Sequence, residues 1–227
     1  MNKQNNGKIL GWFLFANFAV WSLVPLLRLS LPMDTQEAVV WGEYSWIGTT
    51  KHPPLSGILA YIMYCLFGKA DVSMYILSQV CVVTGVVYIY KLALKLLSSD
   101  TALLSVLAQF GIIYYHFSSV EFNVNVVSLA LWPMCSYYFW SAYTENKLRD
   151  WILLGICAAF NILNKYICAL QFASFAVFVL ADKNLFKLLK NYKAYVAVLL
   201  ATAIAAPHFY WLYEYDFVTF DSFEMYL

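Results

Sequence analysis

Residues 9–29 read ILGWFLFANFAVWSLVPLLRL, an apolar run that follows Lys3 and Lys8 and contains Arg28 as its one charged side chain. A helix needs about 20 such residues to cross a bilayer. The run is too long for the core of a signal peptide, and no small-residue cleavage site follows it. We therefore expect this segment to remain as a transmembrane helix.

The composition of the whole chain also indicates a membrane protein. Of its 227 residues, 63% are hydrophobic and 12% are charged, whereas a soluble domain has about 45–50% apolar and about 25% charged residues. Lipid tolerates apolar side chains but forces backbone amides to pair within helices or closed barrels. Since the apolar runs are long and do not alternate, we predict an all-α, polytopic transmembrane bundle.

The apolar runs predict about seven spans in a single transmembrane domain, 1–227. Residues 30–71 are more polar and are expected to form an outer loop, in which the short apolar stretch Leu55–Phe67 lies at the membrane interface. The fifth and sixth spans are short and could instead form a re-entrant hairpin. The spans after 9–29 are expected at 72–90, 102–117, 124–143, 151–163, 166–181 and 194–213.

The basic residues indicate the orientation, because Lys and Arg accumulate in short cytoplasmic loops. With the amino terminus inside, ten of the 14 basic residues fall on the cytoplasmic side. Arg28, Lys51, Lys69 and Lys165 fall outside. The cytoplasmic set is Lys3, Lys8, Lys91, Lys95, Lys147, Arg149, Lys183, Lys187, Lys190 and Lys193.

Charge and cysteines exclude several classes of function. A formal net charge of +1 gives no basic face for nucleic acid. The five cysteines lie scattered in apolar stretches without a C-x-x-C pair, so neither a disulfide framework nor a zinc site is expected.

Asp34 and Glu37 open the polar loop. One interpretation is a capping box, in which Asp34 caps a helix and Glu37 reaches back to it. The other places two carboxylates at the mouth of a membrane cavity, with one of them as a base.

The sequence Lys51-His52-Pro53-Pro54 is the second candidate. Paired prolines favour a helix start. Lys51 and His52 beside the free amides of that helix would also suit an anion such as a lipid phosphate.

Polar residues gather again before the fourth span. Ser118 and Glu121 fit a second capping box. Asn123 and Asn125 follow and would enter the span, where polar groups are costly and usually functional or mutually bonded.

Two later places bring polar groups to membrane depth. Lys165 follows Asn161 and Asn164 and precedes Tyr166; it either lines a functional site or snorkels to the headgroups. His208 follows Pro207 in the last span, where a kinked helix is the simpler interpretation. A metal or phosphate site that includes His52 and His208 is a weaker one, and the sequence leaves dependence on a divalent metal open.

In this order the motifs resemble the bacterial GT-C glycosyltransferases, the group related to protein O-mannosyltransferases and to the aminoarabinose transferase that acts on lipid A. The resemblance covers nearly the whole chain. It rests on Asp34-x-x-Glu37-Ala38-x-x-Trp41-Gly42, Lys51-His52-Pro53-Pro54-Leu55, Glu121-Phe122-Asn123-Val124-Asn125 and Asn164-Lys165-Tyr166.

The resemblance implies an enzyme of the bacterial inner membrane that transfers a sugar from a polyprenyl-phosphate donor to a lipid, glycan or protein acceptor on the extracytoplasmic face, with inversion. Asp34 or Glu37 would be the catalytic carboxylate, since Gln36 stands where the family has its first acid. The donor phosphate would be bound by Lys51, His52 and Lys165. Glu121, Asn123, Asn125 and Tyr166 would line the substrate pocket.

Family members are about twice as long, so we expect this chain to be the amino-terminal portion of a larger protein. Two other functions fit the sequence: a transporter or flippase for a polar lipid, and an inactive membrane subunit. The enzyme hypothesis requires Asp34, Glu37, His52 and Glu121 to surround one extracytoplasmic cavity. The identities of the sugar and acceptor are not encoded in any motif.

Overall fold

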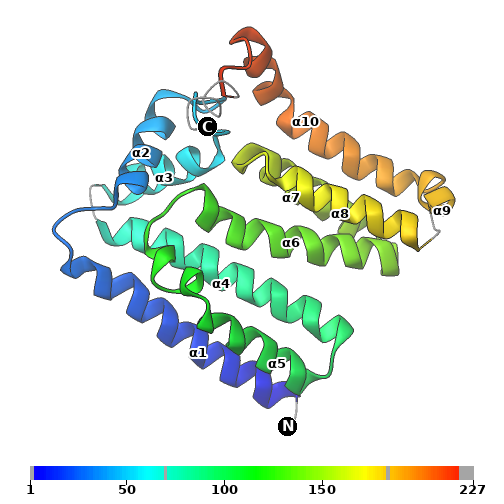
Figure 1. The fold of residues 1–227 in the computed structure, drawn as a ribbon, viewed down its shortest axis with the longest axis horizontal. Coiled ribbons are helices and arrows are strands. Elements are labelled where there is room, and N and C mark those ends of the chain that lie inside the picture. The colour runs from blue at the N-terminus through cyan, green and yellow to red at the C-terminus, as the bar shows by residue number, and fades with distance from the viewer. Residues whose placement is uncertain (1–2, 69–70, 183–184, 220–227) are drawn as a thin grey trace. The chain divides into compact units, whose positions relative to one another are not determined.

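The computed structural model describes residues 3–68, 71–182 and 185–219 (Figure 1). Lys69 and Lys183 lie outside the described residues. Within these ranges the regular structure is helical and contains no strand, so the all-α prediction is confirmed.

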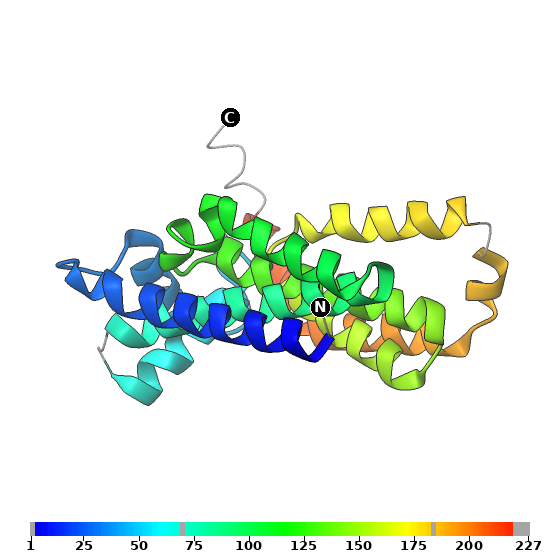
Figure 2. The ribbon, with the colours of Figure 1, turned by 90° about the horizontal axis from the view of Figure 1, so that it is seen from below.

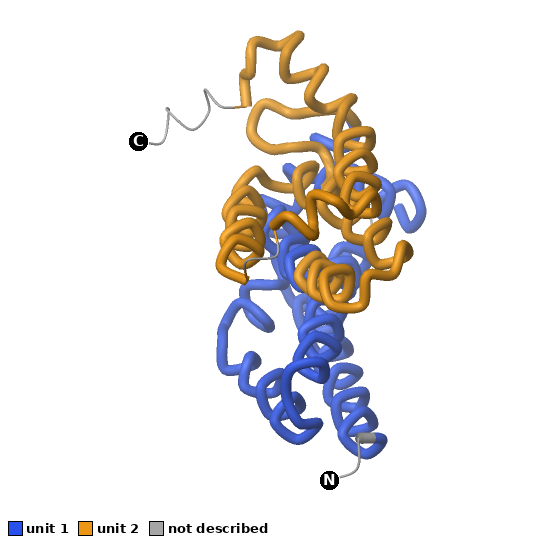
Figure 3. Tube along the Cα trace, turned by 90° about the vertical axis from the view of Figure 1, so that its right-hand side faces the viewer, with its two compact units in different colours: residues 1–44, 56–133 blue, residues 45–55, 134–227 orange. Residues whose placement is uncertain are grey.

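The chain divides into two compact units (Figure 3). Unit 1 comprises residues 1–44 and 56–133, and unit 2 comprises residues 45–55 and 134–227. Helix α6, Val124–Glu145, contains Pro133 at this boundary. The chain leaves unit 1 for residues 45–55, returns to it at residue 56 and passes into unit 2 within α6.

Unit 1 is built on α1 (Lys3–Leu23), α4 (Asp71–Leu96) and α5 (Ser99–Ala108), which pack side by side (Figures 1 and 2). Asp71 lies in the first turn of α4 and Lys95 in its last, the arrangement that the helix dipole favours. Ser98 caps α5 by accepting a hydrogen bond from the Thr101 amide. The core between the three helices consists of Leu10, Leu14, Val82, Val86, Tyr90, Ala93, Ala102, Leu103 and Val106.

Helices α2 (Met33–Tyr44) and α3 (Leu55–Phe67) belong to the outer loop expected from the sequence. Helix α3 begins directly after Pro53-Pro54, as the paired prolines predicted. The two helices approach closely at glycines: a Cβ added to Gly42 would lie 2.0 Å from the carbonyl oxygen of Gly57. Only a residue without a side chain fits there.

Gly42→Ala should therefore destabilise unit 1 by about 1–3 kcal/mol, the usual cost of overpacking. Thermal unfolding of the intact protein in detergent measures this. Gly11→Ala on α1 is the matched control, because nothing lies within 4 Å of its added Cβ. That change should be neutral or stabilise by about 0.5–1 kcal/mol. Equal melting of the two variants would contradict the close approach.

The expected third span, 102–117, is not one straight helix. Segments Ser99–Gly111 and Ile113–Val120 meet at 94°, because the backbone of Ile112 is extended (φ −94°, ψ 121°). The second segment is made of short 3-10 turns, Ile113–Tyr115 and Ser118–Val120.

Unit 2 contains the end of α6 together with α7 (Leu148–Asn164), α8 (Cys168–Ala181), α9 (Leu185–Leu189) and α10 (Tyr192–Glu214). Helices α7 and α10 lie against each other along their length (Figure 1). Their backbones meet where a Cβ on Gly155 would lie 2.5 Å from the Ala197 carbonyl oxygen. Buried Trp151 packs with Ala142 and Ala197 at one end of this pair.

Three described helical stretches are long and apolar enough to cross a membrane: Gln4–Leu27, Asp71–Leu96 and Tyr192–Glu214. The bent pair described above is a fourth candidate. These stretches support a membrane protein. Since α8 has 14 residues and α7 has 17, the number of seven spans stays a prediction.

Candidate functional site

The first group of candidate residues lies in unit 1, at the start of α2. The Asn123 Nδ2 donates to Asp34 Oδ2 over 3.1 Å, and the backbone amide of Asp34 donates to Glu121 Oε1 over 3.3 Å. The fold thus brings together Asp34, Glu121 and Asn123, which we call the acidic cluster. All three side chains are partly exposed.

A buried hydrogen bond of Thr35 supports the acidic cluster. The Thr35 hydroxyl donates to the Phe122 carbonyl oxygen over 3.3 Å, and both residues are fully buried. Because Thr35 and Phe122 are neighbours of Asp34 and Glu121, this bond sets how the two segments lie against each other.

Asn123 also begins the next helix. Its Oδ1 accepts from the amides of Asn125 (2.9 Å) and Val126 (3.2 Å), so Asn123 caps α6 while its amide group donates to Asp34. Neither capping box is formed as the sequence suggested. Asp34 lies inside the first turn of α2, and Glu121 accepts from the amide of Asp34 rather than from that of Ser118.

Two further polar side chains of α2, Glu37 and Gln36, lie near the acidic cluster in sequence. Glu37 follows Asp34 by one helical turn and is half-buried. Gln36 is exposed, and its Nε2 donates to the Leu31 carbonyl oxygen over 2.7 Å. Asp34 is thus bonded to the segment that carries Asn123, and Glu37 is the next acid on the same helix.

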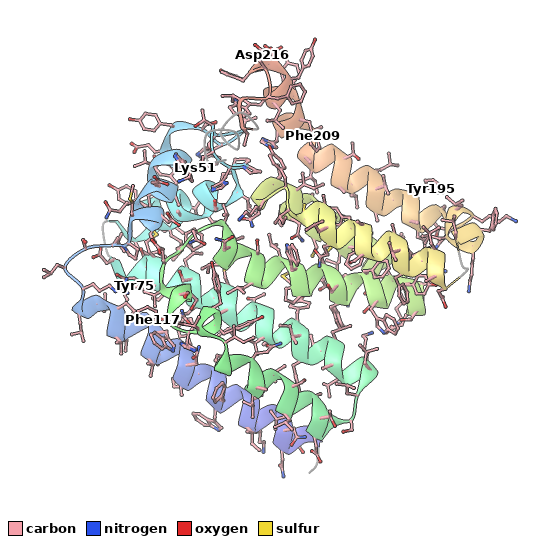
Figure 4. All side chains as sticks on the ribbon, viewed as in Figure 1. Lys51, Tyr75, Phe117, Tyr195, Phe209 and Asp216 are labelled. Atoms are coloured by element: carbon pink, nitrogen blue, oxygen red, sulfur yellow. The ribbon has the colours of Figure 1, made fainter. Side chains whose placement is uncertain are left out.

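The second group lies in unit 2, on the segment 45–55, where Figure 4 labels Lys51. The Thr49 hydroxyl donates to the His52 carbonyl oxygen (2.6 Å) and accepts from the His52 amide (3.2 Å). This tight turn presents Lys51 and His52, both half-buried, just before buried Pro53.

His208 of α10 holds this segment in place. Its side chain is 1% exposed; Nδ1 lies 2.7 Å from the Ile47 carbonyl oxygen and Nε2 lies 2.7 Å from the Tyr166 hydroxyl. A carbonyl oxygen only accepts, so Nδ1 carries the proton and Nε2 of the neutral ring accepts from Tyr166. His208 therefore connects the segment 45–55 to the turn between α7 and α8.

Two more contacts support the same segment. Trp211, one turn after His208, stacks on its ring and covers Gly48, where an added Cβ would lie 2.2 Å from the indole. The Thr219 hydroxyl donates to the Thr49 carbonyl oxygen over 2.9 Å. The backbone that carries Lys51 and His52 is thus bonded to α10 and to the residues that follow it.

Lys165 and Tyr166 lie at the end of α7. The Lys165 side chain is half-buried, and its amide donates to the Asn161 carbonyl oxygen over 3.0 Å. Asn161 and Asn164 are 1% exposed. Unit 2 thus links two predicted basic segments, Lys51-His52 and Lys165-Tyr166, through His208.

The described residues contain no group of three or more His, Cys, Asp or Glu side chains that could hold a metal ion. Both nitrogens of His208 are already hydrogen-bonded, so its interpretation as a metal ligand is not supported. His52 as a ligand stays a prediction.

A family described as dolichyl-phosphate-mannose-protein mannosyltransferase matches residues 51–211. The chain belongs to this family. The resemblance to the GT-C glycosyltransferases is thereby confirmed. In this member of the mannosyltransferase family, the matched range contains Lys51, His52, Glu121 and Lys165. Asp34 and Glu37 precede the matched range.

A curated relative is similar over nearly the whole chain. It is a lipopolysaccharide core galacturonosyltransferase of Rhizobium johnstonii, 22% identical over 97% of this chain. The chain spans about half the length of that relative, 46%. No solved structure matches the chain.

Sequence reasoning missed two residues that position the candidate site. No role was predicted for Thr35, and His208 was predicted only as a ligand or as part of a kinked helix. The signal for His208 was present: a polar ring inside an apolar helix has to find partners. Its partners, Ile47 and Tyr166, are far away in sequence and could not be identified from spacing.

Proposed function

We propose that this chain is the amino-terminal part of a glycosyltransferase that moves a sugar from a polyprenyl-phosphate donor to a lipid, glycan or protein acceptor of the bacterial cell envelope. The observation that carries the proposal is the acidic cluster in a member of this mannosyltransferase family. A carboxylate held by an asparagine donor and partly open to solvent suits a base that orients an acceptor hydroxyl.

In the proposed reaction, Asp34 or Glu37 removes the proton of the acceptor hydroxyl. The hydroxyl oxygen then bonds to the anomeric carbon while the bond from that carbon to the phosphate oxygen breaks, which inverts the configuration. Lys51, His52 and Lys165 neutralise the polyprenyl phosphate that leaves. Little covalent chemistry is required of the protein, because alignment and charge stabilisation lower the barrier.

Glu121, Asn123, Asn125 and Tyr166 would line the substrate pocket in this proposal. The reaction would take place on the extracytoplasmic face of the inner membrane, with the amino terminus in the cytoplasm. The excess of basic residues in the expected cytoplasmic loops supports that orientation.

The test is a transfer assay with the intact protein in detergent, using a radiolabelled polyprenyl-phosphate sugar and an extract of envelope glycolipids. We expect labelled sugar in covalent linkage to an acceptor, together with one released polyprenyl phosphate for each sugar. In proteoliposomes, movement of intact labelled donor between leaflets without a covalent product would instead identify a flippase and refute the proposal.

A further inference from the structure

An apolar groove of about 570 Å³ runs through unit 2 between the end of α6 and helices α7, α8 and α10. Phe139, Ala158, Phe175 and Ala201 are among its lining residues. Figure 2 shows α8 running apart from α10, with α9 at the end between them. Along α10 the groove extends from Ala194 to Phe209, the latter labelled in Figure 4.

The groove has the length of a lipid chain. The stretch of α10 that lines it rises by about 22 Å at 1.5 Å per residue. One leaflet accounts for about half of a hydrocarbon core that is about 30 Å thick. A single acyl chain that enters from one membrane surface would therefore fit within the groove.

A polar pocket of about 340 Å³ adjoins one end of the groove. Trp151 and Leu188 line both spaces, so the two are adjacent. Lys187 and Lys190 line the pocket, and no acidic residue is among its lining residues. An apolar channel that ends in a basic pocket matches an amphipathic anion.

The oxygen acceptors around the pocket already have partners. The Asn146 side-chain oxygen accepts from the Trp151 indole (3.0 Å) and from Asn191 Nδ2 (2.9 Å), and its carbonyl oxygen accepts from Lys193 Nζ (2.6 Å). Left-handed Asn146 (φ 50°) begins the turn between α6 and α7 that makes these bonds possible.

Three acids lie near the pocket in sequence: Asp150, directly before Trp151, is half-buried, and the other two are engaged. Asp182 accepts a hydrogen bond from the Tyr143 hydroxyl, and Glu145 pairs with Lys147 at 2.6 Å. Lys187 and Lys190 are exposed and form no ion pair with another described residue. Their charges are therefore available to a negatively charged ligand.

We propose that the pocket and groove together bind an anionic phospholipid of the membrane, with its phosphate at Lys187 and Lys190 and one acyl chain along α10. Basic pockets between membrane helices bind anionic headgroups in this way, and Tyr143 and Trp151 suit the headgroup level. The distribution of basic residues assigns this end of unit 2 to the cytoplasmic leaflet.

This lipid site is separate from the residues proposed to hold the donor phosphate. Asn146 precedes α7, whereas Lys165 follows it, and the 17 residues of that helix separate its ends by about 25 Å. The lipid phosphate would thus lie at the opposite end of unit 2 from Lys165, while the groove for its acyl chain extends toward Ile162 and Phe209. The inference does not depend on the proposed function.

The experiment compares the binding of dioleoyl phosphatidylglycerol and dioleoyl phosphatidylcholine to the intact, delipidated protein by native mass spectrometry in detergent. Phosphatidylglycerol should bind more tightly. The double variant Lys187→Gln/Lys190→Gln should weaken phosphatidylglycerol binding roughly 10- to 30-fold, at about 1 kcal/mol for each lysine. The control Lys91→Gln/Lys95→Gln, with the same charge change on α4, should leave it unchanged.

A second variant tests the groove without altering charge. Ala201→Phe places an aromatic ring in the groove and should reduce binding of phosphatidylglycerol by a similar factor while the protein keeps its melting temperature. Equal affinity for the two lipids, or unchanged binding by the double lysine variant, would overturn the proposal. Competition by inorganic phosphate as strong as by the lipid would also overturn it, since the pocket would then bind phosphate alone.

Discussion

Asp34→Asn and Glu37→Gln should each be tested for sugar transfer, and the variant that removes the base should lose about 10²–10⁴-fold in turnover. The change keeps size and hydrogen-bonding capacity but removes the ability to take a proton. Asp34 is the stronger candidate, because Asn123 donates to its carboxylate and Glu121 accepts from its amide. Single-turnover transfer by the intact protein gives the rates.

Glu43→Gln is the matched control for both variants. Glu43 is an exposed acid on the same helix, α2, so its replacement makes the same chemical change away from the acidic cluster. Its turnover should remain within a factor of about two of the original protein, as expected for a surface substitution. Full turnover in both Asp34→Asn and Glu37→Gln would remove the carboxylates from the mechanism.

Asn123→Asp distinguishes the two carboxylates. Aspartate caps a helix as well as asparagine does, so α6 keeps its start. The new carboxylate faces Asp34, and a like charge makes ionisation of a neighbouring acid harder. If Asp34 is the base, the rising limb of the pH–rate profile moves to higher pH; if Glu37 is the base, the limb stays where it was.

His208→Leu should give the largest loss of stability in unit 2. The leucine leaves the Ile47 carbonyl without its donor His208, at about 1–3 kcal/mol. It also removes the bond between His208 and the Tyr166 hydroxyl, which also bonds to Thr219. The total should therefore exceed the cost of the Ile47 bond alone. Thermal unfolding in detergent measures it, and a raised KM for the donor should accompany it because the segment that carries Lys51 and His52 loses a support.

Two further variants, Tyr166→Phe and His116→Leu, provide stability losses with which the loss in His208→Leu can be compared. Tyr166→Phe removes one of the two hydrogen bonds and should cost about 1–3 kcal/mol. His116 of unit 1 stacks on Trp21 at 5.6 Å, so its loss should cost at most about 1.5 kcal/mol. Identical melting of His208→Leu and the original protein would show that the histidine does not hold the segment.

Much of the fold could be predicted from the sequence, because apolar runs and prolines act locally. The expected interfacial stretch Leu55–Phe67 is helix α3, and the spans expected at 72–90 and 194–213 lie within α4 and α10. The break at Ile112 was not predicted. Its residues are as apolar as those of a span, and the bend depends on packing.

The residues of the candidate site could be predicted from local sequence, whereas their bonding partners could not. The residue types of the acidic cluster were recognisable, but the bond from Asn123 to Asp34 joins residues 89 positions apart. Spacing within a helix suggested capping boxes, because local partners are all that a spacing can indicate. Tertiary contacts supplied other partners for Asp34 and Glu121.

The excursion of residues 45–55 into unit 2 has a consequence for how the protein is made. Ile47 bonds to His208, which lies 161 positions later. At about 5–20 residues per second, a ribosome needs roughly 8–32 s to reach that histidine. Throughout this interval the nascent stretch with Lys51 and His52 lacks this docking partner, so correct assembly of this region awaits the synthesis of α10.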